Sequence, residues 1–220
     1  MTLNRTRQTD FLNVTQTNGL RIAVVGAGGI GSWTTLTLSK MGFDNITVFD
    51  DDIVEDHNLP SQCYSLVQIG KPKVDALQAV VKAMSGVIIQ ARNQRFALDD
   101  VFDVVLVCVD NMATRRQIAD WFQAGDLSAK VVFDARMAIQ ELILVSYTHE
   151  SVDRYLGALY TDNEAVQEPC TNKAIAFTTN LAAAMLGKAV AEYARDKSRF
   201  GAQITLDGKT PGGAMHYARK

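Results

Sequence analysis

A glycine-rich turn between an apolar run and an amphipathic stretch constrains this chain more than any other feature. The run IAVV at residues 22–25 leads into GAGGIG at residues 26–31, and the amphipathic stretch that follows stops at Gly42. Short apolar runs are typical of strands buried on both faces, and a glycine that ends a helix tolerates positive φ. Because four of its six residues are glycines without a Cβ atom, the backbone of the turn can approach a phosphate beside the N–H donors of the helix start. We therefore expect a nucleotide-binding strand–turn–helix; a tight turn that serves only packing is the alternative.

The alternation of strand and helix continues along the chain. Further apolar runs predict strands at residues 46–49, 87–91, 104–109, 130–134, 142–147 and 203–206. Amphipathic or alanine-rich stretches predict helices at residues 73–84, 113–124 and 173–193, whereas residues 148–172 look irregular. Such alternation builds a mostly parallel twisted sheet with helices on both faces. The expected fold is one Rossmann-like α/β domain over residues 1–220, with antiparallel strands toward the C-terminus, an N-terminal arm at 1–20 and a C-terminal tail at 198–220.

Composition excludes several classes of protein. The 22 Lys and Arg residues nearly balance the 24 Asp and Glu residues and are spread along the chain, so we expect no nucleic-acid partner. Apolar residues at 47% and charged residues at 21% are typical of a globular protein. No run approaches the roughly 18 apolar residues of a membrane span, and the polar N-terminus lacks the apolar core of a signal peptide. Three widely spaced cysteines favour neither a disulfide framework nor a zinc site, so we expect a cytoplasmic protein without a membrane partner.

Carboxylates follow the predicted strands at the edge where ligands of such sheets bind. Asp50 ends the second strand, roughly 20 residues after the glycine turn, where a carboxylate can accept hydrogen bonds from ribose hydroxyls. Asp110 ends the strand at 104–109 and could hold Mg²⁺ together with nucleotide phosphates. A helix N-cap is the alternative role of Asp110. Together with the glycine turn, these positions predict an adenosine nucleotide.

The polar loop after Asp50 favours a triphosphate. Asn58, Gln62, Lys71 and Lys73 supply donors for phosphate oxygens, and lysine acts there as a point charge. Lys71 is better explained as a solvated loop residue than Lys73. An enzyme that uses ATP therefore fits this loop better than a hydride-transferring dehydrogenase.

The ordered set of motifs resembles the ThiF/MoeB/HesA family, the bacterial relatives of ubiquitin-activating enzymes. The matching features are GAGGIG, the pattern DxDxVExxNLxxQ over residues 50–62, GxPK ending at Lys73, and VDN at residues 109–111 with an arginine shortly after. The resemblance extends from about residue 7 to residue 193. It implies that MgATP adenylates a carboxylate, usually the C-terminal glycine of a ubiquitin-like or sulfur-carrier protein, with release of pyrophosphate.

The resemblance also implies a role for each matching residue. Residues implied in ATP binding are Gly26, Gly28, Gly29, Gly31, Asp50, Asp52, Asn58, Gln62 and Lys73. Lys73 would stabilise charge on the triphosphate, and Asp110 would orient Mg²⁺ and the reacting carboxylate. Arg7, in an Arg-Gln pair, would reach into the ATP site of a partner subunit, which implies a homodimer; a disordered, solvated tail is the alternative for Arg7. Cys170 stands just before the alanine-rich helix, where family members carry a reactive cysteine that could attack the acyl-adenylate; a buried structural cysteine is the alternative.

This sequence departs from the family pattern in three ways. Ser61 stands where the family has an arginine, so one phosphate-binding cation is missing. The arginines that could replace it are Arg92, Arg95, Arg115, Arg116 and Arg136. The paired CxxC zinc motifs are absent, and the chain leaves little room for an additional catalytic-cysteine domain.

Two other functions stay open on the sequence. The loss of the family arginine at Ser61 fits a nucleotide-binding subunit without catalysis. An NAD-dependent oxidoreductase could use the glycine turn and Asp50, but it would have no use for Lys73, Asp110 or Arg7. Adenylation of a small molecule or a tRNA base is a variant that the sequence does not separate from the first hypothesis.

Overall fold

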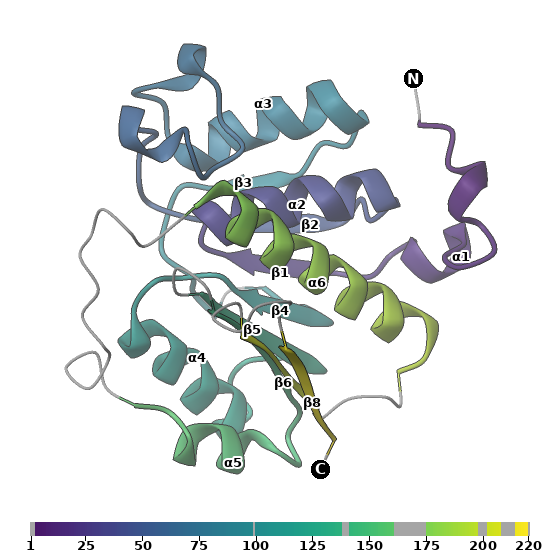
Figure 1. Ribbon diagram of the computed structural model, residues 1–220, viewed down its shortest axis with the longest axis vertical. Helices are drawn as coiled ribbons and strands as arrows, with labels where there is room; N and C mark the ends of the chain where they lie inside the picture. Colours follow the sequence, from purple (N-terminus) through teal and green to yellow (C-terminus); the bar gives the residue numbers. More distant parts are fainter. Residues whose placement is uncertain are drawn as a thin grey trace.

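The computed structural model of the chain describes residues 3–98, 100–137, 141–160, 175–197, 202–207 and 214–219. One eight-stranded sheet has the order β3-β2-β1-β4-β5-β6-β7-β8 (Figure 1). Neighbouring strands from β3 to β5 in this order are parallel, and those from β5 to β8 are antiparallel. The strands are β1 (Ile22–Val25), β2 (Ile46–Phe49), β3 (Gln90–Arg92), β4 (Val104–Val107), β5 (Val131–Met137), β6 (Glu141–Tyr147), β7 (Ala202–Asp207) and β8 (Ala214–Arg219). The predicted fold class, including its antiparallel strands, is confirmed.

Helices cover both faces of the sheet (Figure 1). On one face lie α2 (Gly29–Met41), α3 (Lys73–Ser85) and α6 (Ala176–Arg195). On the other lie α4 (Met112–Ala124) and α5 (Val152–Gly157). Shorter helical turns are η1 (Thr6–Gln8), α1 (Val14–Thr17), η2 (Asp56–Asn58) and η3 (Leu66–Gln68). Within the described ranges, none of the helices has the length and apolar character to cross a membrane.

The central strands β1, β2 and β4 are buried along their whole length. Their side chains alternate between the two faces. Val24 and Leu106 belong to the core beneath α2 and α6, whereas Val25 and Val107 belong to the core beneath α4 and α5. This double burial explains the uninterrupted apolar runs in the sequence. Because β1 pairs in parallel with both β2 and β4, the carboxyl ends of these three strands lie side by side.

Several bounds differ from the sequence-based expectations, since β4 ends at Val107, β5 extends to Met137 and α6 begins at Ala176, and three further elements differ for a physical reason. β3 begins later than the apolar run at 87–91, because α3 ends at Gly86 in a left-handed conformation and the chain must then return to the sheet. α5 lies within the stretch that looks irregular; six residues show no periodicity, and the burial of Val152 and Tyr155 stabilises this helix. β8 was not expected, since its structure depends on pairing with β7.

Candidate active site

The carboxyl ends of β1, β2 and β4 bring together the glycine turn, the carboxylates that follow Phe49, and Asp110. At two positions of the turn, only glycine fits against the neighbouring backbone. Gly26 has φ +95°, and a Cβ atom there would lie 2.9 Å from the carbonyl oxygen of Cys108. A Cβ atom at Gly31 would collide with the carbonyl oxygen of Gly26. The packing explanation considered for the turn therefore holds for these two residues.

The other two glycines lie at the start of α2. A Cβ atom at Gly29 would be 2.8 Å from Cγ2 of Thr179 in α6, and Met137 lies close by, so Gly29 allows α6 to pack against α2. At Gly28 a Cβ atom would meet nothing within 4 Å. Gly28 is also the N-cap of α2, and no side chain caps this helix start. The open space and the N–H groups of the first turn are the features that a bound anion needs.

Asp50 connects the end of β2 to the glycine turn. Its Oδ2 accepts a hydrogen bond from the Ala27 N–H at 2.6 Å, and its Oδ1 accepts one from the Asp52 N–H at 2.9 Å. Each carboxylate oxygen has a second lone pair, so these bonds leave room for ribose hydroxyls. Ala27 is held from the other side by Tyr64, whose buried hydroxyl donates to the Ala27 carbonyl at 2.7 Å. Sequence reasoning missed Tyr64; an isolated aromatic residue in a polar loop is the only signal.

Lys73 and Asp52 form an ion pair at the same edge of the sheet. Their Nζ and Oδ2 atoms are 2.7 Å apart, and the Lys73 N–H donates to the Asp52 carbonyl at 2.9 Å. The Lys73 side chain is only 9% exposed, whereas that of Asp52 is 68% exposed. The packing of the lysine stem therefore fixes the direction of its ammonium, and a solvated carboxylate balances its charge.

The two amides predicted to face phosphates have different surroundings. Asn58 is buried, and its Oδ1 accepts from the Glu55 N–H at 2.9 Å, so this side chain already shapes the turn η2. The Oε1 atom of Gln62 is buried and has no hydrogen-bond partner among the described residues. The predicted role as a donor to phosphate would therefore fall to Nε2, whereas Oε1 can accept only from a donor such as a hydroxyl or amino group of a nucleotide.

Asp110 is exposed, and its carboxylate makes no hydrogen bond or ion pair with any described residue. The N-cap of α4 is Asn111, whose Oδ1 accepts from the Thr114 N–H at 2.8 Å. The alternative interpretation of Asp110 as the N-cap is therefore wrong. A carboxylate placed at this edge without a protein partner is available to a cation or a substrate.

Comparison with known proteins decides the family. A family model described as the ThiF family matches residues 7–204. The chain belongs to the ThiF family. A molybdopterin-synthase adenylyltransferase from Escherichia coli is 32% identical over 157 residues, which cover 65% of this chain and 61% of that protein. A ubiquitin-like modifier-activating enzyme 5 from Bombyx mori is 32% identical over 139 residues, which cover 51% of this chain and 35% of the relative. The chain thus spans about a third to three fifths of these relatives.

The fold has close counterparts among solved structures. The crystal structure of E. coli MccB with ATP superimposes with a TM-score of 0.72 over 91% of this chain and 64% of that one, at 15% sequence identity. At this identity the likeness concerns the fold. The resemblance in the sequence to the ThiF family is confirmed by the family match.

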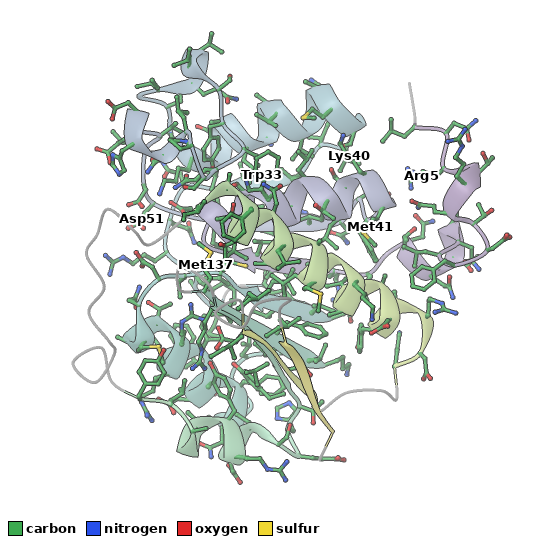
Figure 2. All side chains as sticks on the ribbon, in the orientation of Figure 1. Arg5, Trp33, Lys40, Met41, Asp51 and Met137 are labelled. Carbon is green, nitrogen blue, oxygen red and sulfur yellow. The ribbon has the colours of Figure 1, made fainter. Side chains whose placement is uncertain are left out.

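The structure shows the surroundings of Ser61, which occupies the position of the ThiF-family arginine. Ser61 is buried, and its carbonyl accepts from Nε1 of Trp33 at 3.0 Å, close to the start of α2 (Figure 2). Of the five candidate replacements, four are engaged in ion pairs; these are Arg92 with Asp100, Arg95 with Asp51, and Arg115 and Arg136 with Asp134. Arg116 is exposed.

Arg7 lies far from the glycine turn of its own chain. It is exposed on η1, and this segment contacts the C-terminal end of α2, where Nε2 of Gln8 donates to the Met41 carbonyl at 2.5 Å. Figure 2 shows Arg5 and Met41 at this end and Trp33 toward the other. Because α2 has 13 residues, about 20 Å separates its ends. The structure therefore does not bring Arg7 into the site of the same chain.

The cysteines within the described ranges are poor nucleophiles. Burial raises the pKa of Cys63 to about 11 and that of Cys108 to about 12. Both thiols therefore stay protonated near neutral pH, and a protonated thiol is unreactive. Cys108 is part of the core beneath α2 and α6. Cys170 lies outside the described residues.

Proposed function

We propose that this chain is an ATP-dependent adenylyltransferase that converts a carboxylate into an acyl-adenylate. The observation that carries the proposal is the meeting, at one edge of the sheet, of an uncapped helix start with open space at Gly28 and an unpaired carboxylate at Asp110. The buried ammonium of Lys73 lies at the same edge. Relatives named as adenylyltransferase and modifier-activating enzyme support this chemistry.

The residues present fit MgATP as a substrate. The start of α2 offers N–H donors and space for phosphates, and the buried Oε1 of Gln62 can accept from a hydroxyl or amino group of the nucleotide. Mg²⁺ that arrives with a nucleotide needs one or two carboxylates in addition to phosphate oxygens, and Asp110 is exposed and unpaired among the described residues. We assign ATP binding to the set implied by the sequence, namely Gly26, Gly28, Gly29, Gly31, Asp50, Asp52, Asn58, Gln62 and Lys73.

Adenylation needs positioning and charge stabilisation more than covalent help. A carboxylate oxygen of the substrate would attack the α-phosphorus of ATP. The new P–O bond forms while the bond to the bridging oxygen breaks, and pyrophosphate leaves with the electron pair. Lys73 would exchange Asp52 for a phosphate oxygen, and Asp110 would hold Mg²⁺ near the reacting groups.

We assign the carboxylate to the C-terminal glycine of a ubiquitin-like or sulfur-carrier protein, with later transfer to Cys170 as a further prediction. The names of the two relatives support a protein substrate of this kind. A cytoplasmic location and a single domain over residues 1–220 belong to the same proposal.

ATP–pyrophosphate exchange tests this function. Purified protein is assayed with a panel of small proteins from the same source that end in Gly-Gly, with MgATP and labelled pyrophosphate. We expect exchange that depends on one of these proteins. ATP binding without exchange would favour the subunit without catalysis, and binding of a nicotinamide dinucleotide in preference to ATP would favour the oxidoreductase.

The glycine turn provides a matched pair of variants. Gly31→Ala places a Cβ atom against the Gly26 carbonyl, so we expect a loss of about 1–3 kcal/mol in the free energy of unfolding. Gly28→Ala meets open space at φ −76°, so we expect a change within about 0.5 kcal/mol together with weaker ATP binding. Chemical denaturation and calorimetric titration with ATP measure the two effects. Unchanged ATP affinity in Gly28→Ala would contradict a phosphate site at this position.

We also propose a homodimer in which Arg7 acts on the partner's site, because Arg7 lies at the far end of α2 from its own glycine turn. Mixing the inactive variants Arg7→Ala and Lys73→Ala should restore exchange, since one site of each mixed dimer would have both residues. Random pairing in such a C2 dimer predicts about a quarter of the parent activity. Co-purification of one variant with an affinity-tagged copy of the other is the control for subunit exchange. No recovery in a mixture that exchanges subunits would contradict action in trans.

A further inference from the structure

A buried arginine lies directly behind Asp110. Arg115 belongs to the first turn of α4, and its side chain is 5% exposed. Its Nη2 donates to the carbonyl of Val109, the residue before Asp110, and Nη1 and Nη2 both donate to the carbonyl of Ala135 at 3.3 Å. Nη1 also faces Oδ1 of Asp134. One guanidinium thus connects the segment after β4 and residue Ala135 of β5 with the start of α4.

The neutralisation of Asp134 does not by itself require Arg115. Asp134 is fully buried, but Nε of Arg136 lies 2.6 Å from its Oδ2, and the Tyr155 hydroxyl donates to the same oxygen at 2.9 Å. Burial, followed by the charge of Arg136, lowers the pKa of Arg115 to about 10, so the second arginine is costly. Removing one member of a buried ion-pair group is nevertheless destabilising, and Oδ1 of Asp134 has no hydrogen-bond partner among the described residues besides its ion pair with Arg115. Beyond its charge, Arg115 adds the hydrogen bonds to the carbonyls of Val109 and Ala135.

These hydrogen bonds fix the backbone on one side of Asp110, and the N-cap fixes it on the other. The Val109 carbonyl is held by Arg115, and Asn111 is held through its bond with the Thr114 N–H at 2.8 Å. Between them, the Asp110 carboxylate has no partner of its own among the described residues. Its position therefore depends on these two backbone anchors.

We propose that Arg115 is a positioning residue that holds the Asp110 carboxylate in the orientation needed for Mg²⁺ and the reacting groups. The proposal rests on the proposed function, in which Asp110 contacts the metal and Arg115 does not. Removal of a partner that orients a metal ligand typically costs about 10- to 100-fold in metal affinity or activity.

Arg115→Lys is the informative variant. It keeps a positive charge beside Asp134, but a single ammonium cannot reproduce the planar fork that reaches two carbonyls. Arg21→Lys is the matched control, because Arg21 forms a two-bond ion pair with Asp103, at 3.1 Å for each bond, at the opposite end of β1 and β4. If Arg115→Lys does not fold, Arg115→Gln, which keeps one amide donor for a carbonyl, replaces it.

ATP binding by calorimetry, with Mg²⁺ and with EDTA, gives a readout that does not depend on turnover. We expect the parent and Arg21→Lys to bind ATP more tightly with Mg²⁺. In EDTA, Arg115→Lys should bind ATP with the affinity of the parent. The factor by which Mg²⁺ raises the ATP affinity should be about tenfold smaller in this variant. Its ATP–pyrophosphate exchange should also require a higher Mg²⁺ concentration. Because both residues act through one metal contact, adding Arg115→Lys to Asp110→Ala should cause no further loss.

The outcomes separate two failures. A parent protein without exchange and without Mg²⁺-dependent ATP binding would overturn the proposed function and this proposal with it. An active parent together with an Arg115→Lys variant that has a normal Mg²⁺ dependence would overturn only the positioning role. The same holds if Arg115→Lys and Asp110→Ala lose activity additively, since Arg115 would then act independently of Asp110.

Discussion

Asp110→Ala is expected to lower the rate of ATP–pyrophosphate exchange by on the order of a hundredfold or more while the fold remains intact. The Asp110 carboxylate is exposed and has no hydrogen bond or ion pair among the described residues, so its removal should change the free energy of unfolding by less than about 0.5 kcal/mol. In the proposed mechanism, however, it holds the cation that neutralises the triphosphate. Loss of a transition-state charge contact of this kind costs on the order of 10²–10³ in turnover.

Exchange, ATP affinity in EDTA and thermal unfolding together test this expectation. ATP binding without Mg²⁺ should be largely retained, because the start of α2, Asp50 and Lys73 remain. Asp120→Ala is the matched control, since Asp120 is an exposed aspartate on α4, the helix that follows Asp110. An Asp110→Ala variant as active as Asp120→Ala would show that the proposed mechanism is wrong.

The strands that surround the site were predictable because they are buried on both faces. β1 and β2 have the bounds expected from their apolar runs, and α2 ends at Gly42 as expected. Parallel strands bring their following loops to one edge, so the sequence was sufficient to place Asp50 and Asp110 near the glycine turn. The elements that it missed, α5 and β8, depend on contacts with distant segments.

The partners of charged side chains could not be predicted in this way. Arg115 and Arg136 both pair with Asp134, and no local pattern indicates that a β5 carboxylate would engage two arginines. The same limit applies to the glycines. Gly28 and Gly31 look equivalent in GAGGIG. A Cβ atom at Gly31, however, would collide with the carbonyl oxygen of Gly26, whereas a Cβ atom at Gly28 would face open space. Each distinction comes from atoms that the fold brings together.

Lys73→Met is expected to lower the turnover of exchange by on the order of 10²–10³ and to raise the KM for ATP much less. In the protein without nucleotide, Nζ of Lys73 already forms an ion pair with Asp52 at 2.7 Å. On binding, a phosphate oxygen of ATP would therefore replace the Asp52 carboxylate as the partner of Lys73. This replacement limits how much Lys73 adds to the affinity for ATP in the ground state. Charge that grows on the leaving pyrophosphate strengthens the contact only in the transition state, so the effect should appear mainly in kcat.

Stability should change little in this variant, which separates a catalytic effect from a structural one. Methionine retains an apolar stem at the buried position of Lys73, and Asp52 is 68% exposed, so water can solvate the carboxylate that is left behind. Ion pairs with an exposed partner contribute about 0–1 kcal/mol. Lys71→Met is the control, because Lys71 is exposed and only two residues away. Equal losses of kcat in the two variants would indicate a general effect of positive charge near the site, whereas a loss confined to Lys73→Met would assign the triphosphate contact to this ammonium.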